Sequence, residues 1–218
     1  NKQTSNRPGN TTEASAVFDT QDNVYVLFDR DRGTWIYSPT NNTFTKMNPG
    51  GTPPNRVPNS AGYFSGMSYD SANDKVYLFG GELGGGSYTN DLYTYDVPSN
   101  TWARPAPTGT LPSGRQFAGF AYDSKDNIFL MVGGRDATGY LNDTWVYDPV
   151  GNAWTQLKPA QSPAVTPGST TYQRLAYDPD DNVFALTWPG SGGFIGGQPS
   201  GYSAVQTWFF RYAGTGNN

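Results

Sequence analysis

The sequence contains no cysteine and no histidine, and its only glutamates are Glu13 and Glu82. Without cysteine, the chain has neither a disulfide framework nor a thiol nucleophile. Without histidine, it lacks the commonest general base and the usual zinc and copper ligand. It also has no run of about 20 apolar residues and no charged-then-apolar leader, so we expect no membrane span. These absences favour a non-catalytic protein that uses neither a metal nor a cofactor.

Basic residues are also few, because 14 Lys and Arg stand against 18 Asp and Glu. A net charge of −4 argues against nucleic-acid and anionic-membrane partners, which call for a basic face. Little lysine and abundant Asn, Thr, Ser and Gly are typical of secreted or cell-surface proteins, so we expect an extracellular location. The chain opens at Asn1 without a methionine, and we expect it to be part of, or processed from, a longer one. Glycosylation at the Asn-x-Thr sequences is left open: Asn10, Asn41 and Asn142.

One short sequence motif, an aromatic residue and an aspartate followed by an Asp/Asn-rich turn, occurs four times. Its first aspartates stand at positions 19, 70, 123 and 178, which are 51 to 55 residues apart. A repeat of that length indicates one structural unit used four times. The chain has 15 Tyr, 12 Phe and 6 Trp, so we expect aromatic side chains to supply most of the core.

The third unit shows the expected strands most clearly. Apolar runs at 117–122 and 128–132 flank a tight turn, in which the aspartate accepts backbone N–H bonds from residues further on. A glycine pair follows, then a strand with alternating aromatics at 144–148 and a short strand marked by Trp154. Each unit is therefore predicted to be a four-stranded meander. We expect a single domain over 1–218 whose units cover approximately residues 12–48, 62–105, 116–158 and 171–213.

The pattern resembles the kelch repeat: an apolar strand, Gly-Gly, a loop, Asn-Asp-x-aromatic-x-Tyr-Asp, and a Trp seven residues after the Tyr. The second and third units match fully, with Tyr95 before Trp102 and Tyr147 before Trp154. The first and fourth units lack the glycine pair. The resemblance implies an all-β protein, a β-propeller of four kelch-like blades with no helix longer than a turn or two.

The fourth unit stops short, because the position seven residues after Phe210 is Asn217 rather than a tryptophan. The third strand would then be an open edge, which natural proteins normally cover. Three alternatives remain: a partner or second copy supplies the strand, the chain is part of a longer propeller, or a closed four-blade ring has a three-stranded last blade. The predicted assembly edge comprises Trp208, Phe209, Phe210 and Tyr212.

The meander places its long connections on one face, where binding residues concentrate on a rigid scaffold. These connections are residues 49–60, 81–89, 105–114, 134–141, 159–170 and 189–204. We therefore predict a non-catalytic binding module that holds a protein or glycan through aromatic and arginine anchors. The candidate anchors are Arg56, Tyr88, Arg115, Arg135, Tyr140, Arg174, Phe194 and Tyr202.

Other interpretations remain open. A carbohydrate-processing enzyme could use Glu82 and Asp136, the loop-face acids we would pair. A structural subunit of an extracellular filament could assemble through the open last blade. The aspartate clusters resemble calcium ligands, but their recurrence in every unit favours hairpin turn chemistry. The Asn-Asp pairs at 90–91 and 142–143 are expected to bond local backbone.

Overall fold

The computed structural model describes residues 7–8, 14, 15–29, 33–54, 66–161, 174–188, 194–195, 198–199 and 206–212. Strands β1 to β18 account for the regular structure of these residues, and none of them lies in a helix. None of the described segments could therefore cross a membrane as a long apolar helix. The expected all-β architecture is confirmed.

Four sheets form the blades of a β-propeller, as the resemblance implied. Blade 1 consists of β1 (Ser15–Asp19), β2 (Val24–Asp29), β3 (Gly33–Ser38) and β4 (Thr43–Lys46). Blade 2 consists of β5 (Gly50–Gly51), β6 (Gly66–Asp70), β7 (Lys75–Gly84), β8 (Ser87–Asp96) and β9 (Thr101–Ala103). Blade 3 consists of β10 (Gly119–Asp123), β11 (Ile128–Asp136), β12 (Gly139–Asp148) and β13 (Ala153–Leu157). Blade 4 consists of β14 (Arg174–Asp178), β15 (Val183–Trp188) and β18 (Gln206–Phe210).

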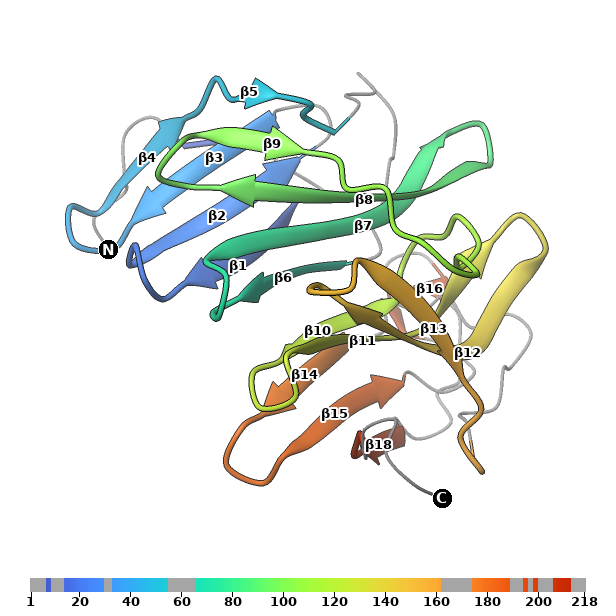
Figure 1. The fold of residues 1–218 in the computed structure, drawn as a ribbon. Coiled ribbons are helices and arrows are strands. Elements are labelled where there is room, and N and C mark those ends of the chain that lie inside the picture. The colour runs from blue at the N-terminus through green and yellow to red at the C-terminus, as the bar shows by residue number, and fades with distance from the viewer. Residues whose placement is uncertain are drawn as a thin grey trace.

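The blades follow one another in sequence order (Figure 1). The innermost strands β1, β6, β10 and β14 lie side by side, each in contact with the next. The tips of the β7–β8 and β11–β12 hairpins project on the right of Figure 1, and we call that side the loop face. The opposite side, the turn face, carries the short turns that join the first two strands of each blade.

The aspartate turns form as the sequence predicted. In blade 3, the Asp123 carboxylate accepts the N–H groups of Lys125 and Asp126 at 2.8 and 3.0 Å. Asp19, Asp70 and Asp178 cap their own turns in the same way. The last turn residue has a positive φ in every blade, a conformation that Asn and Asp tolerate better than most side chains. Aspartate capping of the turn and its positive-φ last residue thus explain why the motif recurs in every blade.

The hydrophobic core lies between the blades. We call the side of a blade that faces the preceding blade its leading face, and the other side its trailing face. Phe129 and Trp154 on the leading face of blade 3 pack against Tyr77 and Phe79 on the trailing face of blade 2. The blade 1–2 and 3–4 boundaries are packed in the same manner. Burial of these large apolar surfaces is the main stabilising contribution that fixes each blade against the next.

The connections differ from the expectation in two respects. Residues 81–89 and 134–141 are mostly strand rather than loop, because β7–β8 and β11–β12 continue as long hairpins. The connectors between blades run first along the outer edge of the next blade. β5 pairs in parallel with β9, and Thr108 forms a parallel bridge with Ala153. Blade 2 is therefore five-stranded, and backbone pairing covers the edges of blades 2 and 3.

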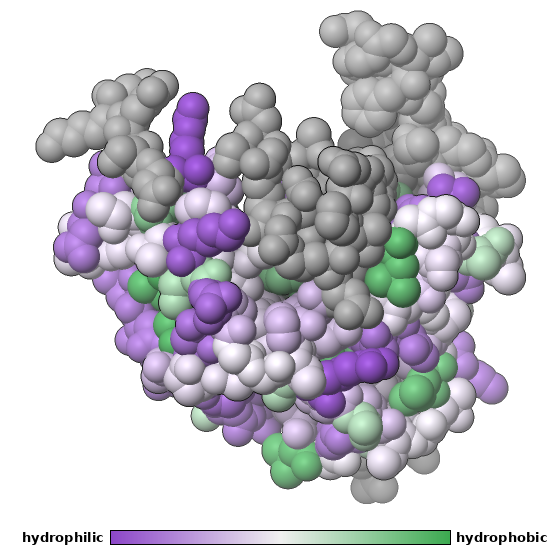
Figure 2. Space-filling model, turned by 90° about the horizontal axis from the view of Figure 1, so that it is seen from above, coloured by the Kyte–Doolittle hydropathy of each residue, from purple (hydrophilic) through white to green (hydrophobic). Residues whose placement is uncertain are grey.

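In the part of the chain that the structure describes, blade 4 comprises three strands, in the order β14-β15-β18. Among the described residues, β18 pairs with β15 alone. A small hairpin of β16 (Phe194–Ile195) and β17 (Gln198–Pro199) precedes β18 in the chain and was not expected. Phe209 is 69% exposed, whereas Tyr212 packs against the blade 3–4 core. Elsewhere, the side seen in Figure 2 carries small, separate hydrophobic patches among polar residues.

Candidate functional site

Two long hairpins build the candidate site on the loop face. In each hairpin a glycine pair shifts the strand register, between Phe79 and Gly81 in one and between Val132 and Gly134 in the other. All four glycines have positive φ. A Cβ on Gly134 would lie 2.8 Å from the carbonyl oxygen of Gln116, so only glycine allows the neighbouring chain to approach. The pairs thus let the hairpins extend beyond the sheets and receive a crossing segment.

The crossing segment is the connector that enters blade 3. Its Arg115 carbonyl accepts the N–H of Gly81 at 2.7 Å, and its Arg115 N–H donates to Thr89 at 3.3 Å. One residue later, Gln116 exchanges two backbone hydrogen bonds with Arg135, at 2.9 and 2.8 Å. The segment therefore joins the hairpin of blade 2 to the hairpin of blade 3. Main-chain bonds thus tie the two hairpins together below their tips.

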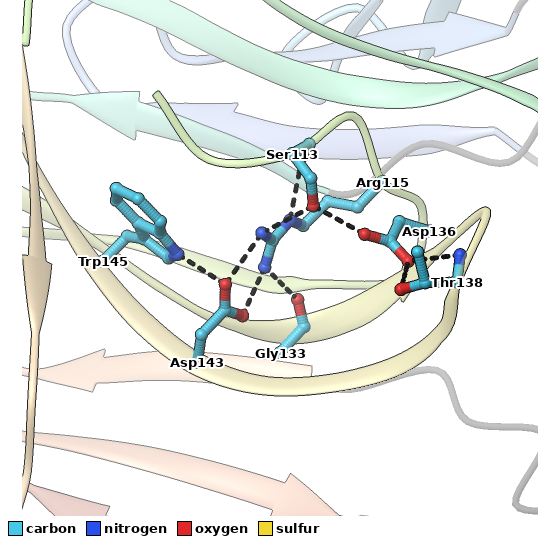
Figure 3. A network of polar contacts seen from close by, with 7 residues as sticks. All are labelled: Ser113, Arg115, Gly133, Asp136, Thr138, Asp143 and Trp145. Atoms are coloured by element: carbon cyan, nitrogen blue, oxygen red, sulfur yellow. Dashed lines mark hydrogen bonds and ion pairs between the residues drawn. The ribbon is translucent and has the colours of Figure 1, made fainter. Parts of the chain in front are cut away.

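A buried arginine completes this junction (Figure 3). The Arg115 guanidinium is 1% exposed and binds both carboxylate oxygens of Asp143, at 2.5 and 2.9 Å. It also donates to the carbonyl of Gly133 at 2.9 Å and to the hydroxyl of Ser113 at 3.0 Å. Asp143 accepts a further bond from the indole N–H of Trp145 at 2.7 Å. This bidentate, fully bonded geometry makes Arg115 a structural clamp at the floor of the site.

Between the two hairpin tips lies a hollow of about 510 Å³. Its lining is Gly85, Gly86, Ser87, Tyr88, Ser113, Gly114, Asp136 and Ala137. Asp136 is the acidic residue of this lining, and its Oδ2 accepts a bond from the Ser113 hydroxyl at 2.9 Å. Its Oδ1 accepts bonds from the N–H and hydroxyl of Thr138, at 2.8 and 2.6 Å. The site is thus an open hollow in which Asp136 and two serines lie beside glycines, an alanine and one aromatic wall.

The Asp136 carboxylate is held in its ionised form. Burial alone would raise its pKa, but the hydrogen bonds from Thr138, Ser113 and Gly139 outweigh burial and lower the pKa below its usual value. A general acid needs the opposite shift. Glu82 does not line the hollow, and its carboxylate accepts the N–H of Gly86 at 3.2 Å within its own hairpin. This arrangement gives no support to the Glu82 and Asp136 enzyme pair.

The structure brings together only some of the predicted anchors. Tyr88 lines the hollow. Arg135 is exposed and directly precedes Asp136 in the sequence. Its guanidinium lies 5.6 Å from the centre of the Tyr140 ring. Arg115 is buried beneath the hollow, and Arg174 is exposed at the start of β14 in blade 4. Three anchors cannot be placed: Arg56, Tyr202 and the side chain of Phe194 lie outside the described residues.

Sequence reasoning missed Ser113 and misassigned Asp143. Asp143 was expected to bond local backbone, but its carboxylate binds Arg115 instead. Its counterpart Asp91 likewise binds a side chain, the guanidinium of Arg104. Asn90 does bond backbone, at the carbonyl of Pro112, which lies in the connector rather than nearby in sequence. The Pro-x-x-Arg spacing that ends at Arg115 was the available signal for an arginine that reaches the next blade.

An acidic cluster lies on the turn face, away from this site. Carboxylate oxygens of Asp19, Asp22 and Asp74 lie within 4.8 Å of one another. Burial and the neighbouring charge of Asp19 raise the pKa of Asp22. Asp19 already accepts the N–H groups of Gln21 and Asp22 in its turn. Turn capping therefore accounts for this cluster without an ion.

Comparison with known proteins agrees with the repeat pattern. A family model, the KLHDC2/KLHL20/DRC7 Kelch-repeats domain, matches residues 2–176. The chain is 30% identical over 128 residues to the Rho GTPase-activating protein gacHH of Dictyostelium discoideum, a match that covers 56% of the chain and 8% of that protein. It is 31% identical over 139 residues to dynein regulatory complex subunit 7 of Chlamydomonas reinhardtii, covering 63% of the chain and 11% of the relative.

A mouse relative, the Rab9 effector protein with kelch motifs, is 26% identical over 156 residues. That match covers 72% of the chain and 38% of the relative. The chain therefore spans less than half the length of these relatives. The family match covers most of the chain and coincides with the repeats that form the blades. The chain belongs to the kelch-repeat family.

Proposed function

We propose that this chain is a non-catalytic module that binds a protein through the hollow between the β7–β8 and β11–β12 hairpin tips. Kelch-repeat domains are typically protein-interaction modules. The observation that carries the proposal is the hollow itself, which lies between two hairpins that the Arg115 clamp and the crossing segment tie together. Preorganised walls reduce the entropy that a binding site loses when a partner docks.

The chemistry of the hollow favours a basic side chain of the partner. Asp136 is ionised, and its Oδ2 receives one hydrogen bond from the described residues, so it can accept another. Tyr88 supplies an aromatic wall on which a lysine or arginine stem can pack. We therefore propose a segment carrying Lys or Arg as the feature that the hollow recognises. A glycan on the same face is the second candidate, and the expected extracellular location stays a prediction.

A displayed random peptide library selected on the immobilised chain tests this proposal. Selected peptides should share a basic residue. Their affinity should fall at least about tenfold in Asp136→Asn and in Tyr88→Ala, since both remove central contacts. Asp178→Asn on the turn face serves as the matched control and should leave the affinity unchanged. Peptides whose binding ignores both loop-face substitutions would refute the proposed site.

Two parallel assays address the other candidates. A glycan array is run with the same variants. If a glycan binds and Asp136→Asn abolishes that binding, the ligand of the hollow is a glycan rather than a protein. A hydrolysis assay on wild type and Glu82→Gln tests the enzyme alternative. Turnover that disappears with this single change would favour the enzyme over the binding module.

A further inference from the structure

The hydrogen bonds around Asp136 leave its carboxylate with one acceptor position for a ligand. We propose that this position takes a primary ammonium group of the partner, carried by a lysine side chain, in preference to an arginine guanidinium, and that Thr138 sets this preference. The inference rests on the proposed function, because it requires that a basic group enters the hollow. Three features support it: the bonds that Asp136 accepts, the contrasting carboxylate of Asp143, and the wall of the hollow.

Both oxygens of the Asp136 carboxylate already accept hydrogen bonds from the chain (Figure 3). Oδ1 accepts two, from the N–H of Thr138 at 2.8 Å and from its hydroxyl at 2.6 Å. Oδ2 accepts one, from the hydroxyl of Ser113 at 2.9 Å. The N–H of Gly139, in the same turn, adds a weaker interaction. Each carboxylate oxygen offers about two lone pairs, so among the described residues Oδ1 is saturated and one position stays open on Oδ2.

The direction of the Ser113 bond is fixed by the arginine on its other side. The Arg115 guanidinium donates to the Ser113 hydroxyl at 3.0 Å, and a guanidinium has no acceptor. The hydroxyl oxygen must therefore accept from Arg115, which leaves its hydrogen for Asp136. Arg115 is itself held by Asp143 and by the carbonyls of Gly133 and Ser113. The bond to Oδ2 is thus maintained by a buried group and keeps Asp136 in one orientation.

Asp143 shows the contact that a guanidinium prefers. Its Oδ1 and Oδ2 bind Nη1 and Nη2 of Arg115, so both oxygens share one arginine. A planar guanidinium matches a carboxylate best through two such parallel bonds. Asp136 cannot repeat this contact, because Thr138 occupies both positions of Oδ1. An arginine in the hollow would make one bond and leave a second donor facing a saturated oxygen.

A primary ammonium group fits the single open position. It is a compact point charge whose three donors need not lie in the plane of the carboxylate. It can bond Oδ2 and keep its other donors in water, because Gly85, Gly86 and Ser87 at the edge of the hollow are exposed. The apolar stem of a lysine can pack along the ring of Tyr88, which lines the hollow.

The basic side chains of the described residues do not take this position. None of the ion pairs among the described residues includes Asp136. Arg135 directly precedes Asp136, but it pairs across the hairpin with Tyr140 and places its guanidinium over that ring. Within the part of the chain that the structure describes, the position is therefore available to a group from outside.

Backbone amide chemical shifts of the 218-residue chain at pH 7 test the preference with small probes. The matched probes are Nα-acetyl-lysine methylamide and Nα-acetyl-arginine methylamide. Both should shift the amides of residues 136–139, and the lysine probe should bind about three- to tenfold more tightly, since it leaves no donor facing a saturated oxygen. Alanine methylamide tests a chain N-terminus as the source of the ammonium group. It should bind more weakly than the lysine probe, because it lacks the stem that packs on Tyr88.

Thr138→Val tests the residue that sets the preference. It removes the hydroxyl bond to Oδ1 but keeps the N–H bond, so the carboxylate gains a position for a second arginine bond. The arginine probe should then bind more tightly, and the lysine preference should fall to about twofold or less. Thr155→Val removes an exposed threonine hydroxyl from β13, outside the hollow, and should leave the preference unchanged. Thr138→Ala removes the same hydroxyl as Thr138→Val and replaces it if that variant does not fold.

The results separate this inference from the proposed function. If neither the lysine nor the arginine probe shifts the amides of residues 136–139, both are wrong. If the two bind equally, or arginine binds more tightly, the hollow accepts a basic group but the preference for ammonium is refuted. A lysine preference that survives removal of the Thr138 hydroxyl refutes the role of Thr138. Tighter binding of alanine methylamide than of the lysine probe would overturn the assignment to a lysine side chain.

Discussion

Blades 1 and 3 carry the same row of aromatic side chains on their leading faces, but among the residues that the structure describes only the row of blade 3 is covered by another blade. In blade 1, neighbouring ring centroids along the row Phe18, Tyr25, Tyr37 and Phe44 are 4.8, 6.0 and 4.7 Å apart. In blade 3, the row Tyr122, Phe129, Tyr147 and Trp154 has spacings of 5.0, 6.1 and 5.2 Å. Tyr25 is 41% exposed, whereas its counterpart Phe129 is fully buried. Spacing within the sheet is therefore set by the blade, and burial by its neighbour.

The ends of the first strands show the same difference. Burial raises the pKa of Tyr122 and Tyr177, and the aspartate of the preceding blade, Asp70 or Asp123, raises it further. Burial also raises the pKa of Tyr69, and Asp74 and Asp19, the latter from the preceding blade, raise it further. Blade 1 has Phe18 at this position, which offers no hydroxyl, and Asp178 of blade 4 is exposed. The contact that joins each blade to the next therefore cannot join blade 4 to blade 1.

Truncation of the second aromatic in each row, Phe129 or Tyr25, should give the largest difference in the free energy of unfolding between the two blades. Phe129→Ala should lower the free energy of unfolding by about 3–5 kcal/mol, because it opens a cavity between blades 2 and 3. Tyr25→Ala, at the matching exposed position, should cost less than about 1 kcal/mol. Urea unfolding followed by tryptophan fluorescence measures both values. Equal losses would mean that the row of blade 1 is covered as well as the row of blade 3.

Two ion pairs extend the test to polar contacts. Arg115 is buried at the blade 2–3 junction, whereas the Arg104 side chain that binds Asp91 is 55% exposed. Arg115→Met should destabilise the protein by about 3 kcal/mol, because it leaves Asp143 without its partner. Arg104→Met should cost no more than about 1 kcal/mol. Urea unfolding of both variants at low and high salt checks this, and a large loss in Arg104→Met would contradict the assignment.

Much of the fold could be predicted because its determinants are local. The aspartate turns, the glycine pairs and the alternating aromatics each require particular residues at fixed spacing, so the repeats indicated four blades and an incomplete last one. The course of the connectors could not be predicted in this way. The pairing of β5 with β9 and the bridge of Thr108 to Ala153 use backbone groups. The side chains that assist them, Asn100 and Asn152, bond the carbonyls of Asn48 and Ala106, which lie far away in the sequence.

The candidate site was less accessible to sequence reasoning. Tyr88 and Asp136 were selected because they lie on the long connections of one face, and both line the hollow. Arg115 was selected on the same ground but is buried, since its partner Asp143 comes from the next hairpin. Sequence position alone does not show whether an arginine beside a loop faces solvent or a carboxylate. Packing between blades decides that, and it depends on pairs far apart in the chain.

Two threonines at the same position sharpen the contrast between the blade 1–2 boundary and the blade 3–4 boundary. Thr34→Val should cost about 1–2 kcal/mol, because it leaves the buried indole N–H of Trp102 without its acceptor. Thr144→Val should be neutral or stabilising by up to about 1 kcal/mol, because it removes a buried hydroxyl that has no described partner. Urea midpoints of the two variants are directly comparable, and a cost for Thr144→Val equal to that of Thr34→Val would show that its hydroxyl is bonded.

The smallest expected difference lies at the turn-face ends of blades 2 and 3, where Lys75 binds Asp96 but Ile128 takes the place of the lysine. Hydrogen bonds from Lys75 and Ser99 lower the pKa of Asp96 from 3.8 to about 2. A carboxyl whose pKa is lowered by folding contributes stability above its unfolded pKa, and that stability is lost as the pH falls through the folded pKa.

We therefore expect Lys75→Met to cost less than about 1 kcal/mol near neutral pH, because both side chains are partly exposed and solvent screens the pair. The difference from wild type should shrink as the pH falls from about 4 to about 2, where Asp96 becomes protonated in both proteins. Urea unfolding across this range at low salt measures it. Lys158→Met removes the same charge from an exposed position and should show no such dependence, and a constant difference down to about pH 2 would argue that Lys75 stabilises blade 2 through packing alone.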